Sequence, residues 1–429
     1  MTSAPGTSAA TDLLQRAADL FPGGVNSPVR AFRSVDADPI ILAEGHGARV
    51  CDVDGRSYLD YIGGWGPAIL GHGHPAIVEA IRSQAGTGFA LGLTGPLEIE
   101  LGERIRARMP SMERLRFTSS GTEAVMSAIR LARAATGRDL IVKFAGGYHG
   151  HSDGLLVEAG SGLATQAIPG SAGVPIAAAA ATMVLPYNDP TAVEFAFAEH
   201  AGRIAAVIVE PVAANVGVIP PEPGFLEGLR ALTAGDGALL IFDEVITGFR
   251  VGPGGAQERY GVRPDLTTLG KIIGGGMPIG AYGGRRELMG RIAPEGPVYQ
   301  AGTLSGHALS MAAGIATFDA LDAAAYARLE STGAALADGL AVAASEVGRT
   351  VAIGRVGSLL TLYFAQAAPI DAEAAVVGDR VAFGRFFRAM LGSGVLLPPS
   401  PFEAWFVSLA HDQAIIDETL IAARRAFAA

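Results

Sequence analysis

Lys271 is the side chain in this sequence best suited to covalent chemistry. It follows the short apolar run 266–270 and precedes a glycine cluster at 274–276, a pattern that predicts a buried strand running into a loop. Open α/β sheets place their chemistry at such strand ends. Lysine is also scarce, because Lys143 and Lys271 are the only two and arginine supplies almost all of the positive charge. Since a desolvated lysine can lose its proton and attack a carbonyl, which arginine cannot, we favour a Schiff-base lysine over a surface lysine that caps a strand.

Acidic residues follow two further apolar runs. Glu210-Pro211 comes directly after the run 205–209, and Asp243-Glu244 comes after the run 238–242. A buried strand that ends in a charge is costly unless the charge has a partner. Surface charges explain one such site, but three at one sheet edge indicate a shared ligand. A pyridoxal 5′-phosphate site needs a Schiff-base lysine, a carboxylate for the ring nitrogen and a phosphate cradle, and Asp243 is the natural carboxylate.

The segment Ser119-Ser-Gly-Thr-Glu123 joins a predicted strand to a predicted helix. Free backbone N–H groups and the helix dipole at such a junction can hold a phosphate, which makes Ser120, Gly121 and Thr122 candidates for that task. An ordinary helix N-cap is the alternative interpretation, and the two are compatible. Neither a Walker-type phosphate loop nor a dinucleotide-type glycine motif occurs in the chain.

Tyr148 follows a predicted strand, where its ring could stack on a flat cofactor or simply pack in the core. The close pairs His72/His74 and His149/His151 suggest a metal ion. Neither pair has the helical spacing or the nearby carboxylate motif of a zinc enzyme, so no metal site is predicted. The nucleophile motif of the serine hydrolases is also missing from the sequence.

The overall composition is that of an acidic globular protein. Hydrophobic residues make up 49% and charged residues 17% of the 429 residues, which argues against wholesale disorder. A net charge of -10 argues against a nucleic-acid partner, and no unbroken apolar stretch approaches the roughly 20 residues of a membrane helix. The first residues lack the features of a signal peptide, and the single cysteine, Cys51, fits a reducing compartment. A cytoplasmic protein is therefore expected.

Predicted strands and helices alternate through the middle of the chain. Strands are expected at 115–118, 140–144, 205–209 and 238–242, and helices at 122–134 and 224–234. This alternation predicts a mainly parallel sheet covered by helices on both faces. A long loop rich in glycine and alanine is expected at 146–181.

The rest of the chain predicts a smaller companion unit. We expect helices at 11–20, 77–84 and 97–109, short strands at 40–43, 48–52, 57–61 and 359–364, and one long alanine-rich helix after Gly306. The predicted fold class is α/β, with a mainly parallel central sheet flanked by helices and a smaller α+β domain. The predicted division is an N-terminal segment (1–60, part of the small domain), a large cofactor-binding domain (61–315) and a C-terminal small domain (316–429).

The sequence resembles the class III (fold type I) pyridoxal-phosphate-dependent aminotransferases. The resemblance runs nearly from end to end and includes SGTEA at 120–124, DEVITGFR at 243–250 and TTLGKIIGGG at 267–276. PGGVNSPVRAF at 22–32 and FEAWF at 402–406 point to the aminomutase branch of that family, whose members act on glutamate-1-semialdehyde.

The resemblance implies a role for each matching cofactor position. Lys271 carries the cofactor through a Schiff base and shuttles protons, Asp243 pairs with the ring nitrogen, and Tyr148 stacks on the ring. The other cofactor-binding positions that it implies are Ser120, Gly121, Thr122 and Asn215, with Thr303 reaching in from the second subunit of a homodimer.

The resemblance also implies the substrate positions. Ser27 and Arg30 orient the substrate, with the Arg30 guanidinium matched to a carboxylate. Trp65, Ser161 and Glu403 match further substrate-binding positions, and Glu403 is included among the catalytic residues. Many ordinary transaminases of this class carry a mobile arginine that admits a dicarboxylate, and Glu403 fits an enzyme that excludes one.

The implied reaction starts from the pyridoxamine form, which gives its amino group to the aldehyde carbon of glutamate-1-semialdehyde. The resulting 4,5-diaminovalerate returns its other amino group, which leaves 5-aminolevulinate for tetrapyrrole synthesis. No outside amino donor is needed, and the loop 146–181 would be the lid that retains the intermediate. The implied partners are this small substrate, a second copy of the chain and, in transient contact, glutamyl-tRNA reductase.

Several positions depart from the family pattern: Gly64, Gly147, His307-Ala308 and the stretch 86–96. They keep a second hypothesis open, a true transaminase on the same scaffold, for example for a β-amino acid whose carboxylate Arg30 binds. A third hypothesis is a non-catalytic or regulatory protein that binds the cofactor. The joint presence of Lys271, Asp243 and Tyr148 argues against that third hypothesis.

Overall fold

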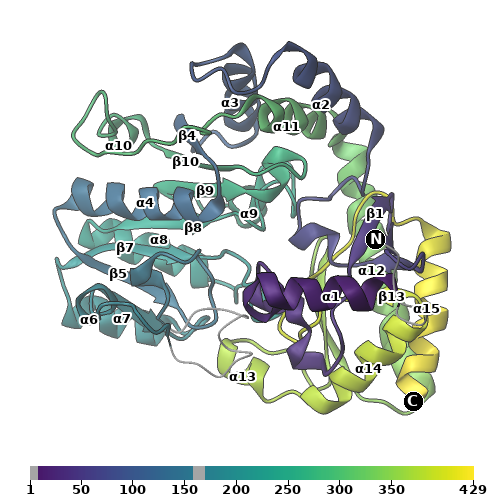
Figure 1. Cartoon of the computed structure of the whole chain (residues 1–429). Helices are drawn as coiled ribbons and strands as arrows, with labels where there is room; N and C mark the ends of the chain where they lie inside the picture. The colour runs from purple at the N-terminus through teal and green to yellow at the C-terminus, as the bar shows by residue number, and fades with distance from the viewer. Residues whose placement is uncertain (1–7, 158–169) are drawn as a thin grey trace.

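The computed structural model describes residues 8–157 and 170–429 (Figure 1). Within this part of the chain, the largest sheet has seven strands. Their spatial order is β4 (Arg114–Thr118), β10 (Gly280–Gly284), β9 (Leu266–Gly270), β8 (Leu239–Asp243), β7 (Ile204–Val209), β5 (Leu140–Phe144) and β6 (Thr182–Leu185). β10 runs antiparallel to β4 and β9, and the other neighbouring pairs are parallel. The prediction of a mainly parallel sheet is confirmed.

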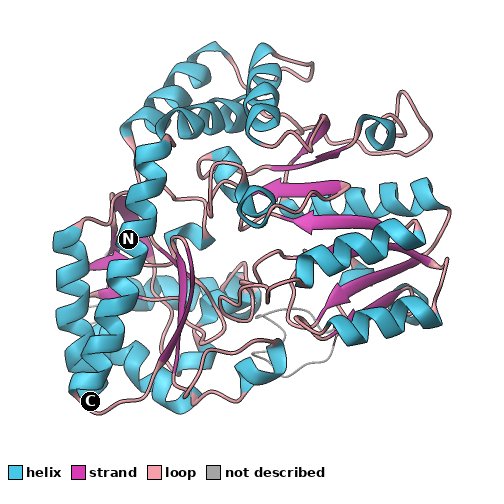
Figure 2. Cartoon of the chain, turned by 180° about the vertical axis from the view of Figure 1, so that it is seen from behind, coloured by secondary structure: helices cyan, strands magenta, loops and turns pink. Residues whose placement is uncertain are grey.

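Helices cover both faces of this sheet (Figure 2). One face packs against α4 (Gly121–Thr136), and the other packs against α7 (Pro190–Glu199) and α8 (Phe225–Asp236). The apolar run of β8 is divided between them, because alternate side chains of a strand point to opposite faces. Leu239 and Ile241 join the core beneath α4, whereas Leu240 and Phe242 join the core beneath α7 and α8. Burial on both faces explains why the central strands are apolar throughout.

The two ends of the chain meet in smaller sheets. β1 (Leu42–His46), β2 (Arg49–Asp52), β3 (Ser57–Asp60) and β13 (Val395–Leu396) form one, and β11 (Ala352–Val356), β12 (Leu359–Tyr363) and β14 (Trp405–Phe406) form another. The helices beside them are α1 (Ala9–Leu20), α12 (Ala323–Glu346), α14 (Arg380–Gly392) and α15 (Gln413–Ala428). β13 pairs in parallel with β3, and Leu59 shares a core with Phe387 and Phe427. The N-terminal and C-terminal segments therefore fold together.

The prediction of one long helix after Gly306 is wrong. Two helices, α11 (Ala308–Ala320) and α12, are bent by 80° relative to each other. The side chain of Asp322 accepts a hydrogen bond from the backbone N–H of Ala325 at 2.7 Å, so this residue caps a new helix. Among the described residues, no single helix is long and apolar enough to cross a membrane, although this bent pair passes the same test when taken together.

The predicted loop at 146–181 is partly structured. It contains a short 3₁₀ turn, η5 (Asp153–Leu155), and a short helix, α6 (Ile176–Ala179), while 158–169 lie outside the described residues. The predicted helices at 77–84 and 97–109 are confirmed as α2 (Pro75–Thr87) and α3 (Pro96–Arg108). The remaining elements are η1 (Pro22–Gly24), η2 (Pro28–Ala31), η3 (Arg33–Val35), η4 (Gly63–Trp65), α9 (Gly255–Tyr260), η6 (Lys271–Gly274), α10 (Arg286–Met289) and α13 (Ala372–Val376).

Candidate active site

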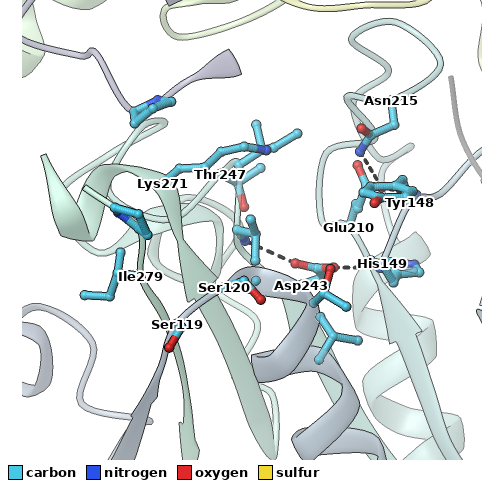
Figure 3. A pocket seen from close by; sticks show the side chains of 18 of the residues that line it. Ser119, Ser120, Tyr148, His149, Glu210, Asn215, Asp243, Thr247, Lys271 and Ile279 are labelled. Carbon is cyan, nitrogen blue, oxygen red and sulfur yellow. Dashed lines mark hydrogen bonds and ion pairs between the residues drawn. The ribbon is translucent and has the colours of Figure 1, made fainter. Parts of the chain in front are cut away.

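A cavity of about 420 Å³ lies at the carboxyl ends of β7, β8 and β9 (Figure 3). These strands run parallel and side by side, so the residues that follow them meet at one edge of the sheet. Glu210, Asp243 and Lys271 all line this cavity, as the strand-end pattern predicted. The opposite wall is formed by the start of α4 and by the segment that follows β5.

Lys271 stands at the end of β9 with a left-handed backbone conformation, φ +51°. Its side chain is partly buried, and burial is the main effect that lowers the pKa of the amine. The nearby Asp243, Glu210 and Glu403 oppose that shift, and Arg250 reinforces it. No hydrogen bond or ion pair engages the amine among the described residues. A lysine whose pKa is lowered is more often in the neutral, nucleophilic form.

Asp243 is the last residue of β8 and is only 4% exposed. Its Oδ2 lies 2.7 Å from Nδ1 of His149, and its Oδ1 accepts hydrogen bonds from Thr268 Oγ1 and from the backbone N–H of Val245, each at 3.1 Å. Nε2 of His149 is buried and has no partner among the described residues. These contacts fix the carboxylate in one orientation at the floor of the cavity.

Glu210 fixes the backbone of the segment that carries Tyr148 by hydrogen bonds. Its Oε1 accepts hydrogen bonds from the backbone N–H of Tyr148 at 2.8 Å and from Nδ2 of Asn215 at 2.9 Å, and its Oε2 accepts one from the N–H of Ala214 at 3.0 Å. Burial raises the pKa of this carboxyl, with a further contribution from Asp243. Figure 3 shows Tyr148, Asn215 and Glu210 grouped on the side of the cavity opposite Lys271.

The start of α4 forms the third part of the site. The Ser120 hydroxyl accepts a hydrogen bond from the N–H of Glu123 at 3.2 Å, and the Glu123 carboxylate accepts one from the N–H of Ser119 at 2.7 Å, so this hydroxyl serves as the helix N-cap. The amides of Gly121 and Thr122 lie in the first turn, where no intrahelical partner exists, and both residues line the cavity. They form a place for an anion.

The residues of this cavity fit pyridoxal phosphate. An amine with a lowered pKa, a hydrogen-bonded carboxylate and a helix start surround one space, as the cofactor requires. The loop that carries Gly150 passes close to the start of α4. A Cβ at Gly150 would lie 2.6 Å from Thr122 Oγ1, so only glycine fits at this position. Among the described residues, no group of three or more His, Cys, Asp or Glu side chains could hold a metal ion.

Other predicted site residues lie away from the lining of this cavity. Ser27 directly precedes η2 and is half-buried, whereas Arg30 lies within η2 and is exposed. Trp65 ends η4, the turn that packs beside the Lys271 stem. Glu403 is 8% exposed and acts on Lys271 through its charge. Thr303 is exposed and lines a separate cavity of about 800 Å³ with Phe89 and Leu304. The predicted position Ser161 is outside the described residues.

The sequence does not predict the contacts of three residues of the site. His149 invites only a metal interpretation there, yet its Nδ1 lies 2.7 Å from Oδ2 of Asp243. Thr268 belongs to the lysine motif without an assigned role, and Glu210 is predicted at the sheet edge without its hydrogen-bond partners. A histidine directly after Tyr148, and a threonine three residues before Lys271, were the available signals. Neither reveals its partner, because the partner is distant in the sequence.

Comparison with known proteins agrees with this architecture. The family model "Aminotransferase class-III" matches residues 32–419. A glutamate-1-semialdehyde 2,1-aminomutase from Thermomicrobium roseum is 58% identical, and the match covers 97% of each chain. Two solved structures are also similar. An ω-transaminase from Sphaerobacter thermophilus has a TM-score of 0.91 and 36% identity, with 99% of this chain and 98% of that chain covered. A glutamate-1-semialdehyde aminomutase variant from Pseudomonas aeruginosa PAO1, in complex with PMP, has a TM-score of 0.86 and 29% identity, with 97% and 93% covered.

Proposed function

The chain belongs to the class III aminotransferases, and on that premise we propose that it is a pyridoxal-phosphate-dependent 2,1-aminomutase. The proposed reaction converts glutamate-1-semialdehyde to 5-aminolevulinate for tetrapyrrole synthesis, with 4,5-diaminovalerate between them. The 58% identity with a full-length aminomutase supports this substrate.

When bound, pyridoxal phosphate supplies an electron sink and an aldehyde that can carry an amino group. The residues of the cavity have complementary tasks in the proposal. Lys271 would hold the cofactor and move protons, for which its lowered pKa suits it. Asp243 would pair with the ring nitrogen, the first-turn amides of Gly121 and Thr122 would bind the phosphate, and Tyr148 would stack on the ring.

The observation that carries the proposal is the charge around Lys271. Three carboxylates, those of Asp243, Glu210 and Glu403, act on its amine. A site of this sign favours an intermediate with two amino groups, because each can be protonated and attracted to a carboxylate. It disfavours a dicarboxylate, which many ordinary transaminases of this class admit as a partner. We assign this discrimination to Glu403, which lies outside the lining of the cavity and acts on Lys271 through its charge.

The test supplies glutamate-1-semialdehyde to the purified holoenzyme with no other amine or keto acid. We expect 5-aminolevulinate to form catalytically while the cofactor spectrum alternates between aldehyde and amine forms. Lys271→Ala should abolish turnover, and Glu403→Gln, which keeps the shape without the charge, should release more diaminovalerate per turnover. Turnover that requires an added amino donor and keto acid contradicts the aminomutase assignment.

A true transaminase is the second candidate, because an ω-transaminase shares this fold with a TM-score of 0.91. The stretch 86–96, which departs from the family pattern, also keeps this candidate open. Its described side chains from Thr87 and Phe89 to Pro96 line the second cavity, with Thr303, and none lines the cavity of Lys271. Within one copy the stretch therefore lies apart from Lys271 and beside Thr303, on the face that the homodimer proposed below would place against the partner's site.

We further propose a homodimer in which Thr303 of one copy completes the site of the other. The exposed apolar side chains of Phe89, Leu91, Leu93 and Leu304 around the second cavity support a contact surface at this face. Subunit exchange between Lys271→Ala and Thr303→Ala variants tests the arrangement. If Thr303 acts across the interface, each mixed dimer regains one intact site and activity returns, whereas no recovery contradicts it.

Two finer points of the proposal are a cytoplasmic location, which the single cysteine supports, and transient contact with glutamyl-tRNA reductase. Cell fractionation tests the first. Co-sedimentation of the two purified proteins tests the second, and separate sedimentation at every concentration contradicts it.

A further inference from the structure

Arg250 places a guanidinium in the core, where no acidic side chain of the described residues pairs with it. The residue is 2% exposed, and its guanidinium donates to three neutral acceptors: Gly66 O, Ser358 Oγ at 3.2 Å and Val407 O at 3.2 Å. Its Nε is buried without a partner, and no carboxylate lies within salt-bridge distance among the described residues. The face of the Phe406 ring lies 5.2 Å from the guanidinium carbon.

Such an arrangement is costly, because a buried charge is normally paired with an opposite one. Burial lowers the pKa of Arg250 to about 9, which still leaves the guanidinium mostly protonated at neutral pH. An apolar side chain of similar length would fill the same space without the cost. A positive charge at this place therefore calls for a functional explanation.

One of the three acceptors, the carbonyl oxygen of Gly66, belongs to a turn that lies against Lys271. Gly66 follows η4, and a Cβ built on it would lie 3.2 Å from Lys271 Cδ and 2.9 Å from Phe406 Cε1. Gly66 thus touches the lysine stem on one side, while its carbonyl oxygen accepts the Arg250 hydrogen bond. Arg250 itself lies in the segment between β8 and α9, so it ties this turn to the strand edge that carries Asp243.

The charges that act on Lys271 come from several elements. Asp243 ends β8, Glu210 follows β7, and Glu403 precedes β14, and these three favour the protonated amine. Arg250 is the cation of this set and favours the neutral amine. The hydroxyl of Tyr326, on α12, is the titratable group that acts on Arg250.

We propose that Arg250 is a positioning residue for Lys271, which fixes the Gly66 turn against the lysine stem and supplies the positive charge that offsets the three carboxylates. Neither task requires contact with substrate or cofactor. The importance of a neutral Lys271 rests on the proposed function, but the electrostatic coupling between the two residues does not.

The scarcity of lysine allows a direct test. Cofactor-free, full-length protein is labelled with trace acetic anhydride over a series of pH values, and mass spectrometry follows acetylation of the peptide that contains Lys271. Lys143, the other lysine, is fully buried, and the α-amino group serves as the internal reference. We expect Arg250→Gln, which retains a donor but no charge, to raise the labelling midpoint of Lys271 by about one pH unit.

Two matched variants separate charge from packing. Arg250→Lys retains a cation, and its new lysine lies in a different peptide. Ser358→Ala removes one acceptor and leaves the guanidinium in place. Both should leave the Lys271 midpoint near the wild-type value, although either can lower Tm. A wild-type midpoint in Arg250→Gln, or equal shifts in all three variants, overturns the proposal.

Arg250→Met provides a second uncharged variant in case Arg250→Gln lacks the wild-type circular dichroism spectrum. The same upward shift is expected, and a wild-type midpoint in whichever uncharged variant folds is decisive against the proposal. Because labelling needs neither substrate nor cofactor, its outcome is independent of the aminomutase assay.

Discussion

Thr268→Val removes one hydrogen bond from Asp243 and little else. Thr268 is fully buried in β9 and lies opposite Asp243 in the parallel pairing of β8 and β9. Its Oγ1 donates to Asp243 Oδ1 at 3.1 Å, while His149 Nδ1 and the N–H of Val245 provide the other two contacts of the carboxylate within 8–157 and 170–429. Valine has nearly the same shape, so the backbone and the packing should be retained.

The expected magnitude follows from the chemistry of that bond. A hydrogen bond to a charged group contributes about 1.5–3 kcal/mol, and two of the three donors to Asp243 remain after the substitution. We therefore expect the free energy of unfolding to change by less than about 3 kcal/mol. If the whole energy of this hydrogen bond is lost from the transition state, kcat/KM falls by roughly 10- to 100-fold, since a tenfold change corresponds to about 1.4 kcal/mol.

The matched control is Thr267→Val on the same strand. Thr267 is equally buried, but its hydroxyl lies 3.4 Å from Gln257 Nε2 and forms no hydrogen bond with a carboxylate among the described residues. Denaturant unfolding and steady-state kinetics of both variants, with the cofactor spectrum recorded in parallel, provide the comparison. Equal losses of kcat/KM in the two variants would refute the role assigned to the Thr268 hydrogen bond.

Three further predictions concern titration and backbone strain near Lys271. Burial lowers the pKa of Lys271, so its contribution to stability is complete above the unfolded value of 10.5 and is lost as the pH falls through the lowered folded value. Cofactor-free Lys271→Met should therefore gain unfolding free energy relative to wild type between pH 10.5 and 7, and a constant difference contradicts this. Burial raises the pKa of Glu210, so its contribution to stability is complete below pH 4.5 and is lost as the pH rises through the raised folded value. In denaturant unfolding, the unfolding free energy of Glu210→Gln should therefore rise relative to wild type from pH 4.5 to 7. The opposite trend excludes the mechanism. Gly66→Ala should lower the unfolding free energy by at least about 1 kcal/mol more than Gly276→Ala does. Both glycines have strongly positive φ, but only a Cβ at Gly66 would meet Phe406, at 2.9 Å. Equal losses in thermal or denaturant unfolding would show that backbone strain alone accounts for the destabilisation.

Much of the fold follows from local pattern. Apolar runs of four to six residues alternating with helical periodicity require strands buried on both faces by helices, and this predicted the parallel sheet. The edge at which Glu210, Asp243 and Lys271 meet follows from the same pattern, because parallel strands bring their carboxyl ends together. The break between α11 and α12 was missed, since an alanine-rich run conceals the capping by Asp322.

The sequence by itself thus determined the kinds of residue at the sheet edge and the strands that carry them. Only the tertiary structure decided their partners. His149 and Asp243 are 94 positions apart, and Arg250 and Gly66 are 184 apart. Periodicity reports which face of its own element a side chain occupies, but a hydrogen bond between distant segments depends on strand register and on how loops return to the sheet. The cost of burying Arg250 or Glu210 becomes visible only when every neighbour is in place, because desolvation depends on the whole surrounding volume.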